Sequence, residues 1–125
     1  VKVFNLAIFS DTKELYLNKE GISSYIVKDN IGKDIVKIRA EDIAKIIENK
    51  IKVDLLKLNV EGAEYEILNR IIETNNLKKF RGFLIQYHRS VENSNELRKK
   101  IRQKFLIENF QEIFNYDFVW EYWTK

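Results

Sequence analysis

The sequence predicts an α/β domain in which helices flank a mostly parallel sheet. Residues 1–9, 53–58 and 83–87 are rich in β-formers and nearly continuous in apolar character, which is typical of strands buried on both faces. Between the last two lies a segment, residues 63–74, whose apolar residues recur at helical spacing. Buried strands that alternate with amphipathic helices indicate a parallel layered fold. We therefore expect the three apolar segments to be neighbouring central strands.

Shorter elements are predicted around that sheet. Residues 10–13 have turn chemistry, residues 14–18 form a short strand, and residues 36–39 alternate like an exposed strand. Residues 40–49 follow with isoleucines on one helical face, which predicts a helix. The pattern of residues 23–30 does not decide between strand and loop.

The C-terminal third is predicted to contain a helix and then a terminal strand or hairpin. Asn93, with Glu96 three residues later, is the expected N-cap pair of a helix that reaches about Phe110. Residues 114–124 alternate aromatic with polar side chains, as a terminal strand or hairpin does. The buried stripe of the helix would consist of Leu97, Ile101, Phe105 and Phe110.

Composition excludes several classes of function. The chain has 45% hydrophobic residues, enough for a single core, and a mildly basic net charge of +3 that identifies no partner. It has no cysteine, which excludes disulfides and thiolate metal sites and fits a reducing, cytoplasmic compartment. No run approaches the roughly 18 apolar residues of a membrane helix. With a single histidine, we expect no metal site.

The start of the sequence has two unusual features. There is no methionine anywhere, and the chain opens inside a strand-like segment without a lead-in. We therefore expect residues 1–125 to be the C-terminal part of a single domain whose first elements lie upstream. Such a part would leave one sheet edge unpaired and apolar, so we also expect a homo-oligomer or association through that edge.

Polar side chains follow two of the predicted buried strands. Asn59, Glu61 and Glu64 come directly after the second strand, and Gln86 and His88 end the third. Ligands of open α/β sheets bind at the carboxyl ends of the strands. Because the two strands are expected to be adjacent, Asn59, Glu61 and His88 should line one cleft.

The residues around these strand ends resemble a known family. Residues 54–68, with the sequence DLLKLNVEGAEYEIL, resemble the signature of FkbM-type methyltransferases, in which a strand with an embedded lysine precedes an acidic residue, a spacer, Glu-Gly, a small residue and Glu. Residues 5–11 and 36–43 resemble the blocks that precede this signature, in the same order, and residues 86–88 correspond to a strand end with Glu, a spacer and His. The resemblance spans nearly the whole chain.

This resemblance implies a fold, a cofactor and site residues. The fold would be part of the seven-stranded class I methyltransferase (Rossmann-like) fold, with S-adenosylmethionine as donor and a hydroxyl of a small molecule or glycan as acceptor. Glu61 would bind or deprotonate that hydroxyl and His88 would assist, as the catalytic pair. The expected cofactor-binding residues are Asn59 and Gly62, and the expected substrate-binding residues are Glu64 and Gln86.

The chain departs from the family pattern in three ways. Asn59 stands where the family usually has Asp, and Gln86 where it usually has Glu, so two carboxylates are lost. Neither amide can act as a general base. The third departure is that the four glycines, at positions 21, 32, 62 and 82, form no Gly-rich loop that could cradle the donor.

The same residues also have simpler structural explanations. Glu61 and Glu64 could be acids of a first helical turn, Asn59 its N-cap, and Gly62 a site of close packing. A lone histidine at a strand end is more often a surface or hydrogen-bonded residue than a catalyst. The alternative function is a non-catalytic remnant that acts as an interaction module. A nucleic-acid partner is not expected, because the basic run at residues 98–104 has the spacing of a solvated helix face.

Overall fold

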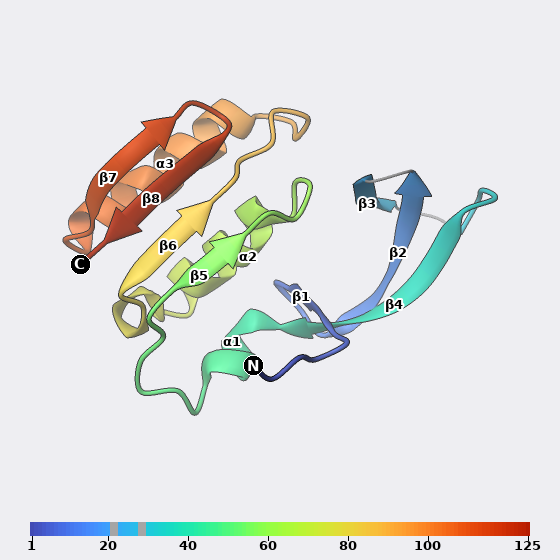
Figure 1. Ribbon diagram of the computed structural model, residues 1–125, viewed down its shortest axis with the longest axis horizontal. Coiled ribbons are helices and arrows are strands. Elements are labelled where there is room, and N and C mark those ends of the chain that lie inside the picture. The colour runs from blue at the N-terminus through green and yellow to red at the C-terminus, as the bar shows by residue number, and fades with distance from the viewer. Residues whose placement is uncertain (21–22, 28–29) are drawn as a thin grey trace.

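The computed structural model describes residues 1–20, 23–27 and 30–125, which form two four-stranded sheets and three α-helices (Figure 1). The strand order is β1-β4-β2-β3 in the first sheet and β5-β6-β8-β7 in the second. Helices α2 and α3 lie side by side on one face of the second sheet. The chain thus contains two mixed sheets in place of one continuous sheet.

The first sheet is built around a long antiparallel pair. Strand β4 pairs antiparallel with β2 on one side and parallel with β1 on the other. Strand β2 also pairs antiparallel with β3. Leucines and isoleucines on alternate positions of these strands, such as Leu15 opposite Ile38, give the sheet one apolar face. The strands are β1 (Ala7–Phe9), β2 (Lys13–Glu20), β3 (Ser23–Val27) and β4 (Ile35–Asp42).

The second sheet combines one parallel unit with a hairpin. Strand β5 continues through α2 to β6, which is its parallel neighbour, while β8 pairs antiparallel with both β6 and β7. The strands are β5 (Leu56–Leu58), β6 (Gly82–Ile85), β7 (Gln111–Tyr116) and β8 (Trp120–Thr124). The helices are α1 (Ile43–Ile47), α2 (Glu64–Glu73), α3 (Ser94–Ile107) and the 3-10 turn η1 (Leu77–Lys79).

Most of the core lies between the second sheet and its two helices, and it continues to Phe9 and Ala40 of the first sheet and to Ile43 of α1. Phe105 of α3 stacks on Phe83 of β6 at 4.7 Å between ring centroids, and Phe110 and Trp123 pack on the same ring pair. All four side chains are buried. Aromatic pairs of this kind contribute roughly 0.5–1.5 kcal/mol each beyond their buried area. This cluster fixes α3 against the sheet.

The predicted fold class is wrong. Four of the six strand pairings among the described residues are antiparallel, so the chain does not form the mostly parallel, Rossmann-like sheet that was expected. The short turn that joins β7 to β8 allows only antiparallel pairing of these two strands. Among the described strands, a helical crossover of the kind that parallel neighbours require connects β5 to β6.

The N-terminal strand is also not where it was expected. Residues 1–6 are outside β1 and largely exposed, and β1 pairs with β4 in the first sheet instead of with β5 or β6. Its apolar character therefore did not indicate burial on both faces. The predicted parallel pairing of segment 53–58 with segment 83–87 is confirmed between β5 and β6. The expected central position of the first of these strands is wrong, because β5 lies at the edge of its sheet.

Several element boundaries need correction. The predicted helix at residues 40–49 is only α1, because Asp42 caps its first turn and the preceding residues extend β4. Strand β6 ends at Ile85, so residues 86–88 lie beyond it. Asn93 has φ +56° and makes no side-chain cap. The strand at residues 14–18, the helix at 63–74 and the terminal hairpin are confirmed. Residues 28–29 of the undecided segment lie outside the described residues.

Candidate functional site

The turn between β5 and α2 has an unusual backbone. Glu61 and Gly62 have φ values of +48° and +106°, and the turn closes with a 3.1 Å hydrogen bond from Ala63 N–H to the Val60 carbonyl. A Cβ on Gly62 would lie 2.9 Å from Val91 Cγ2. Glycine is therefore required here by its φ and by the close approach of Val91. The turn lifts the Glu61 side chain away from the helix.

Glu64 connects this turn to the segment after β6. Its carboxylate is fully buried and accepts hydrogen bonds from the backbone N–H groups of Gly62, at 2.9 Å, and His88, at 2.7 Å. The same Oε1 atom lies 3.2 Å from Nδ1 of the His88 ring. A buried charged acceptor requires donors. The Glu64 carboxylate thus joins the segment that follows β5 to the segment that follows β6.

His88 lies between two carboxylates. Its Nδ1 atom faces Glu64, and its Nε2 atom lies 3.4 Å from Glu61 Oε2. The side chain of His88 is 15% exposed and that of Glu61 is 39% exposed, so the outer carboxylate is open to solvent. The Tyr65 hydroxyl donates to the His88 carbonyl at 3.1 Å. His88 is therefore held by contacts with its imidazole ring and with its backbone.

Two buried tyrosines, Tyr65 and Tyr87, lie next to this cluster. Desolvation and the nearby charge of Glu64 raise the pKa of Tyr65 well above its ordinary value. Burial, and to a smaller extent the charge of Glu121, also raises the pKa of Tyr87. Both rings stay neutral over the physiological range, so Tyr65 remains a hydrogen-bond donor to His88.

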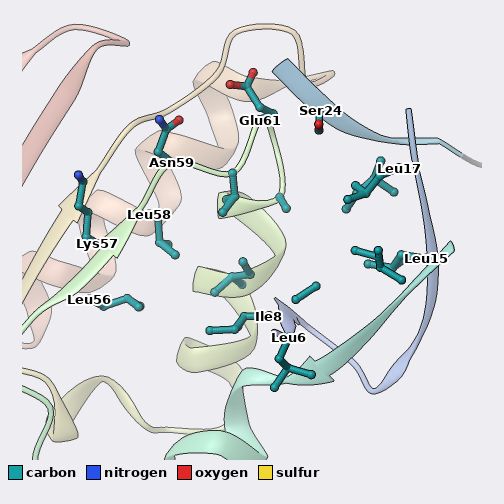
Figure 2. A pocket seen from close by; sticks show the side chains of 16 residues that line it. Leu6, Ile8, Leu15, Leu17, Ser24, Leu56, Lys57, Leu58, Asn59 and Glu61 are labelled. Atoms are coloured by element: carbon teal, nitrogen blue, oxygen red, sulfur yellow. The ribbon is translucent and has the colours of Figure 1, made fainter. Parts of the chain in front are cut away.

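A cavity of about 550 Å³ opens between the two sheets beside this cluster. Figure 2 shows Asn59 and Glu61 beyond the end of β5, with Leu15 and Leu17 of the first sheet on the opposite side. The wall is mainly apolar, and its polar members are Lys57, Asn59 and Glu61 at β5 and the turn after it, and Ser24 of β3. The apolar residues that line it include Leu6, Ile8, Leu15, Leu17, Ile38, Leu56, Val60 and Ile67.

The structure brings together some of the predicted site residues. Asn59 and Glu61 line the cavity. His88 contacts Glu61 but is not part of the cavity wall. Glu64 lies in the interior, and Gln86 donates its backbone N–H to the Leu58 carbonyl at 3.0 Å. Their predicted roles in catalysis and binding stay predictions.

The structural explanations are partly supported. Glu64 is an acid of the first turn of α2, as one explanation required, whereas Glu61 precedes the helix. Ala63 occupies the N-cap position that was considered for Asn59. Gly62 has the close packing that its alternative explanation required.

Sequence reasoning missed the far wall of the cavity and one lysine. Leu15, Leu17 and Ile38 belong to the first sheet, and Lys57 borders the cavity and lies 5.4 Å from the Trp120 ring. The alternation of Leu15 and Leu17 indicated an apolar strand face that needs a partner. It could not indicate which partner, because the contact depends on how the two sheets are placed.

A comparison with protein-family models supplies the decisive observation. The model of the methyltransferase FkbM domain matches residues 5–118, which include both strand ends, the cavity and the Glu61–His88 contact. The chain belongs to the FkbM methyltransferase family. A search of curated proteins found no match, and neither did a search of solved structures.

Membership of the FkbM family makes methyl transfer the activity to which this site is related. The Glu61–His88 pair and Asn59 fall within the matched region, beside a cavity of the size of a small-molecule site. Within residues 1–20, 23–27 and 30–125, no helix is long and apolar enough to cross a membrane.

Proposed function

We propose that this FkbM domain takes part in the transfer of a methyl group from S-adenosylmethionine to a hydroxyl of a small molecule or glycan. The observation that supports the proposal best is the contact of Glu61 with His88 at the rim of an apolar cavity. A positioned carboxylate can act as a general base that removes a proton from a hydroxyl, and a neighbouring imidazole can share that proton. The family match supports the type of reaction.

The cavity suits one end of the proposed donor. S-adenosylmethionine, when bound, supplies an activated methyl group next to a positive sulfonium centre. The amide of Asn59 is a group that would hydrogen-bond the charged end of such a molecule, which leaves Glu61 for the acceptor. The glycines of the described part have structural surroundings, such as Val91 against Gly62, and form no loop for the adenosine. The fit is therefore to the charged end of the donor.

Glu61 is the proposed base of the reaction. Its carboxylate is solvent-accessible, so an acceptor hydroxyl can approach it from the cavity. Transfer of the hydroxyl proton to Glu61 would raise the electron density on the acceptor oxygen. His88 lies behind Glu61, where its Nε2 can share that proton. The rigid turn at Gly62 holds the base in place, which favours reaction by orientation.

The test is a methyl-transfer assay on the protein that contains this chain. Radiolabelled S-adenosylmethionine would be supplied with a panel of polyhydroxylated small molecules and glycans. Once an acceptor is found, Glu61→Gln should lower the rate by about 10²–10⁴-fold, because an amide cannot accept the proton. Glu66→Gln is the matched control, since Glu66 is an exposed acid of α2, the helix that follows Glu61, and accepts from Ser10.

Two results would contradict the proposal. One is a folded Glu61→Gln variant that keeps nearly the activity of the unchanged protein, which would remove the assigned base. The other is absence of transfer to every acceptor despite intact folding, which would favour the alternative of a non-catalytic interaction module.

A further inference from the structure

We infer that Glu64 is a positioning residue that sets the tautomer of His88, with the proton on Nδ1 and with Nε2 free to accept a proton from Glu61. The role of that proton in catalysis rests on the proposed function. The position of the proton on the ring follows from the comparison of two carboxylates: Glu64, at 3.2 Å from Nδ1, is fully buried, whereas Glu61, at 3.4 Å from Nε2, is 39% exposed and can be solvated by water.

Burial excludes Glu64 from direct contact with a ligand in the cavity. Its side chain is fully buried and it is absent from the cavity wall. Both of its carboxylate oxygens are occupied by donors of the protein, Oε2 by Gly62 N–H and Oε1 by His88 N–H. Any influence of Glu64 on the reacting groups must therefore pass through His88 or through the turn at Gly62 that carries Glu61.

The donors around Glu64 determine the hydrogen on the ring. An ionised carboxylate is an acceptor only, and the two backbone groups already facing it are both donors. The third group within reach is Nδ1 of His88, at 3.2 Å from Oε1. This contact is favourable when Nδ1 carries hydrogen. In the alternative tautomer a lone pair would face the buried carboxylate.

The consequence appears at the other nitrogen of the ring. A neutral imidazole has one donor nitrogen, so a hydrogen on Nδ1 leaves Nε2 as an acceptor. Nε2 faces Glu61 Oε2 at 3.4 Å, and two acceptors in contact need one additional proton between them. The row Glu64–His88–Glu61 is thus arranged to take up one proton at its exposed end. In the proposed reaction, the acceptor hydroxyl supplies that proton.

The chain is well suited to a spectroscopic test because His88 is its single histidine. The protein would be prepared with nitrogen-15 and without a histidine tag, and long-range proton–nitrogen correlation spectra of the imidazole would be recorded. In the unchanged protein the neutral ring should show a protonated Nδ1 and an unprotonated Nε2. A neutral ring that carries its hydrogen on Nε2 would overturn the inference without any variant.

Three variants then separate positioning from simple structural support. Glu64→Met removes the acceptor and should lower the ratio of Nδ1–H to Nε2–H tautomer by about tenfold, as expected when a charged acceptor is lost. Glu64→Gln keeps one acceptor oxygen and should restore much of that ratio. Glu66→Met, in the same helical turn but exposed, should leave it unchanged.

The outcomes are distinguishable from failure of the proposed function. Backbone amide spectra report whether each variant is folded. A folded Glu64→Met protein with an unchanged tautomer ratio would show that Glu64 is only structural. If Glu64→Met does not fold, the spectrum of the unchanged protein still decides the tautomer. None of these measurements depends on methyl transfer.

Discussion

Asp42 shows how a single side chain can join two separate parts of this molecule. It accepts from Ala44 N–H at 2.8 Å, which caps α1, and it forms a two-pronged ion pair with Arg70 of α2, the shortest contact being 2.6 Å. The carboxylate is almost fully buried. The Arg70 guanidinium, together with the Ala44 N–H and against the opposing effect of burial, lowers the pKa of Asp42 below its usual range. Asp42 therefore links the first sheet to α2.

Replacement of Asp42 by asparagine should destabilise the fold by about 1–3 kcal/mol at neutral pH, because the cap weakens and the ion pair is lost. The folded-state pKa of Asp42 is lowered, so its contribution is complete above the ordinary value of 3.8 and is lost as the pH falls through the lower, folded-state value. The difference between Asp42→Asn and the unchanged protein should thus shrink in acid.

Urea unfolding at pH 7 and at a series of pH values below 4 measures this difference. Asp54→Asn is the matched control, because Asp54 is highly exposed and its 3.2 Å pair with Arg81 is expected to contribute little. An Asp42→Asn penalty that is unchanged or larger in acid would contradict the assignment.

At the scale of single elements, α3 has two faces with different functions. Its inner face carries the aromatic cluster and also Arg98 and Arg102, which bind Glu121 of β8, whereas its lysines lie on the outer, exposed face. Glu121 is buried and also accepts from the indole of Trp123 at 2.9 Å. The basic run that was expected to be a solvated face is therefore divided. Its arginines fix the terminal hairpin, and its lysines stay exposed.

Phe105→Ala should destabilise the protein by about 3–5 kcal/mol, because the cavity that it creates lies among Phe83, Phe110 and Trp123. Leu106→Ala, at the next position of the same helix, removes a side chain that is 60% exposed and should change stability by no more than about 0.5 kcal/mol. Denaturant unfolding of both variants is the measurement. Equal effects would show that α3 is not fixed by its aromatic face.

At the scale of the whole molecule, two sheets meet around an apolar cavity. Strands β1 and β5 each lie at the edge of their sheet, and Leu6 and Ile8 on the cavity wall are both 38% exposed. Unpaired edges next to apolar side chains favour association with another strand. Self-association through these edges, expected from the sequence, stays a prediction, and sedimentation at increasing protein concentration would test it.

We predict that the 125-residue chain alone binds S-adenosylmethionine weakly, with a dissociation constant well above about 1 μM. The cavity offers Asn59 to the charged end of the donor, but the described part has no glycine turn at which backbone could approach the adenosine closely. Calorimetric titration of the purified chain is the direct measurement. Saturable binding at micromolar donor would show that these residues form a complete cofactor site.

The composition of the candidate site could be predicted from the sequence to a large extent. Asn59, Glu61 and His88 were identified because polar residues that directly follow apolar strands must lie at a strand end, which is a local property. The internal position of Glu64 could not be predicted in this way. Acids are rarely buried, and only the backbone N–H groups of Gly62 and His88, brought together by the pairing of β5 with β6, make its burial favourable.

The sequence by itself determined the family, the β5–α2–β6 unit, helix α3 and the terminal hairpin, because periodicity and turn chemistry act over a few residues. Only the tertiary structure decided that β1 pairs with β4 and that the strands form two sheets, mostly antiparallel. An apolar segment such as β1 can be buried against any apolar surface, since the hydrophobic effect is not directional. Its partner is therefore chosen by chain connections and by specific contacts between distant residues, such as the ion pair of Asp42 with Arg70.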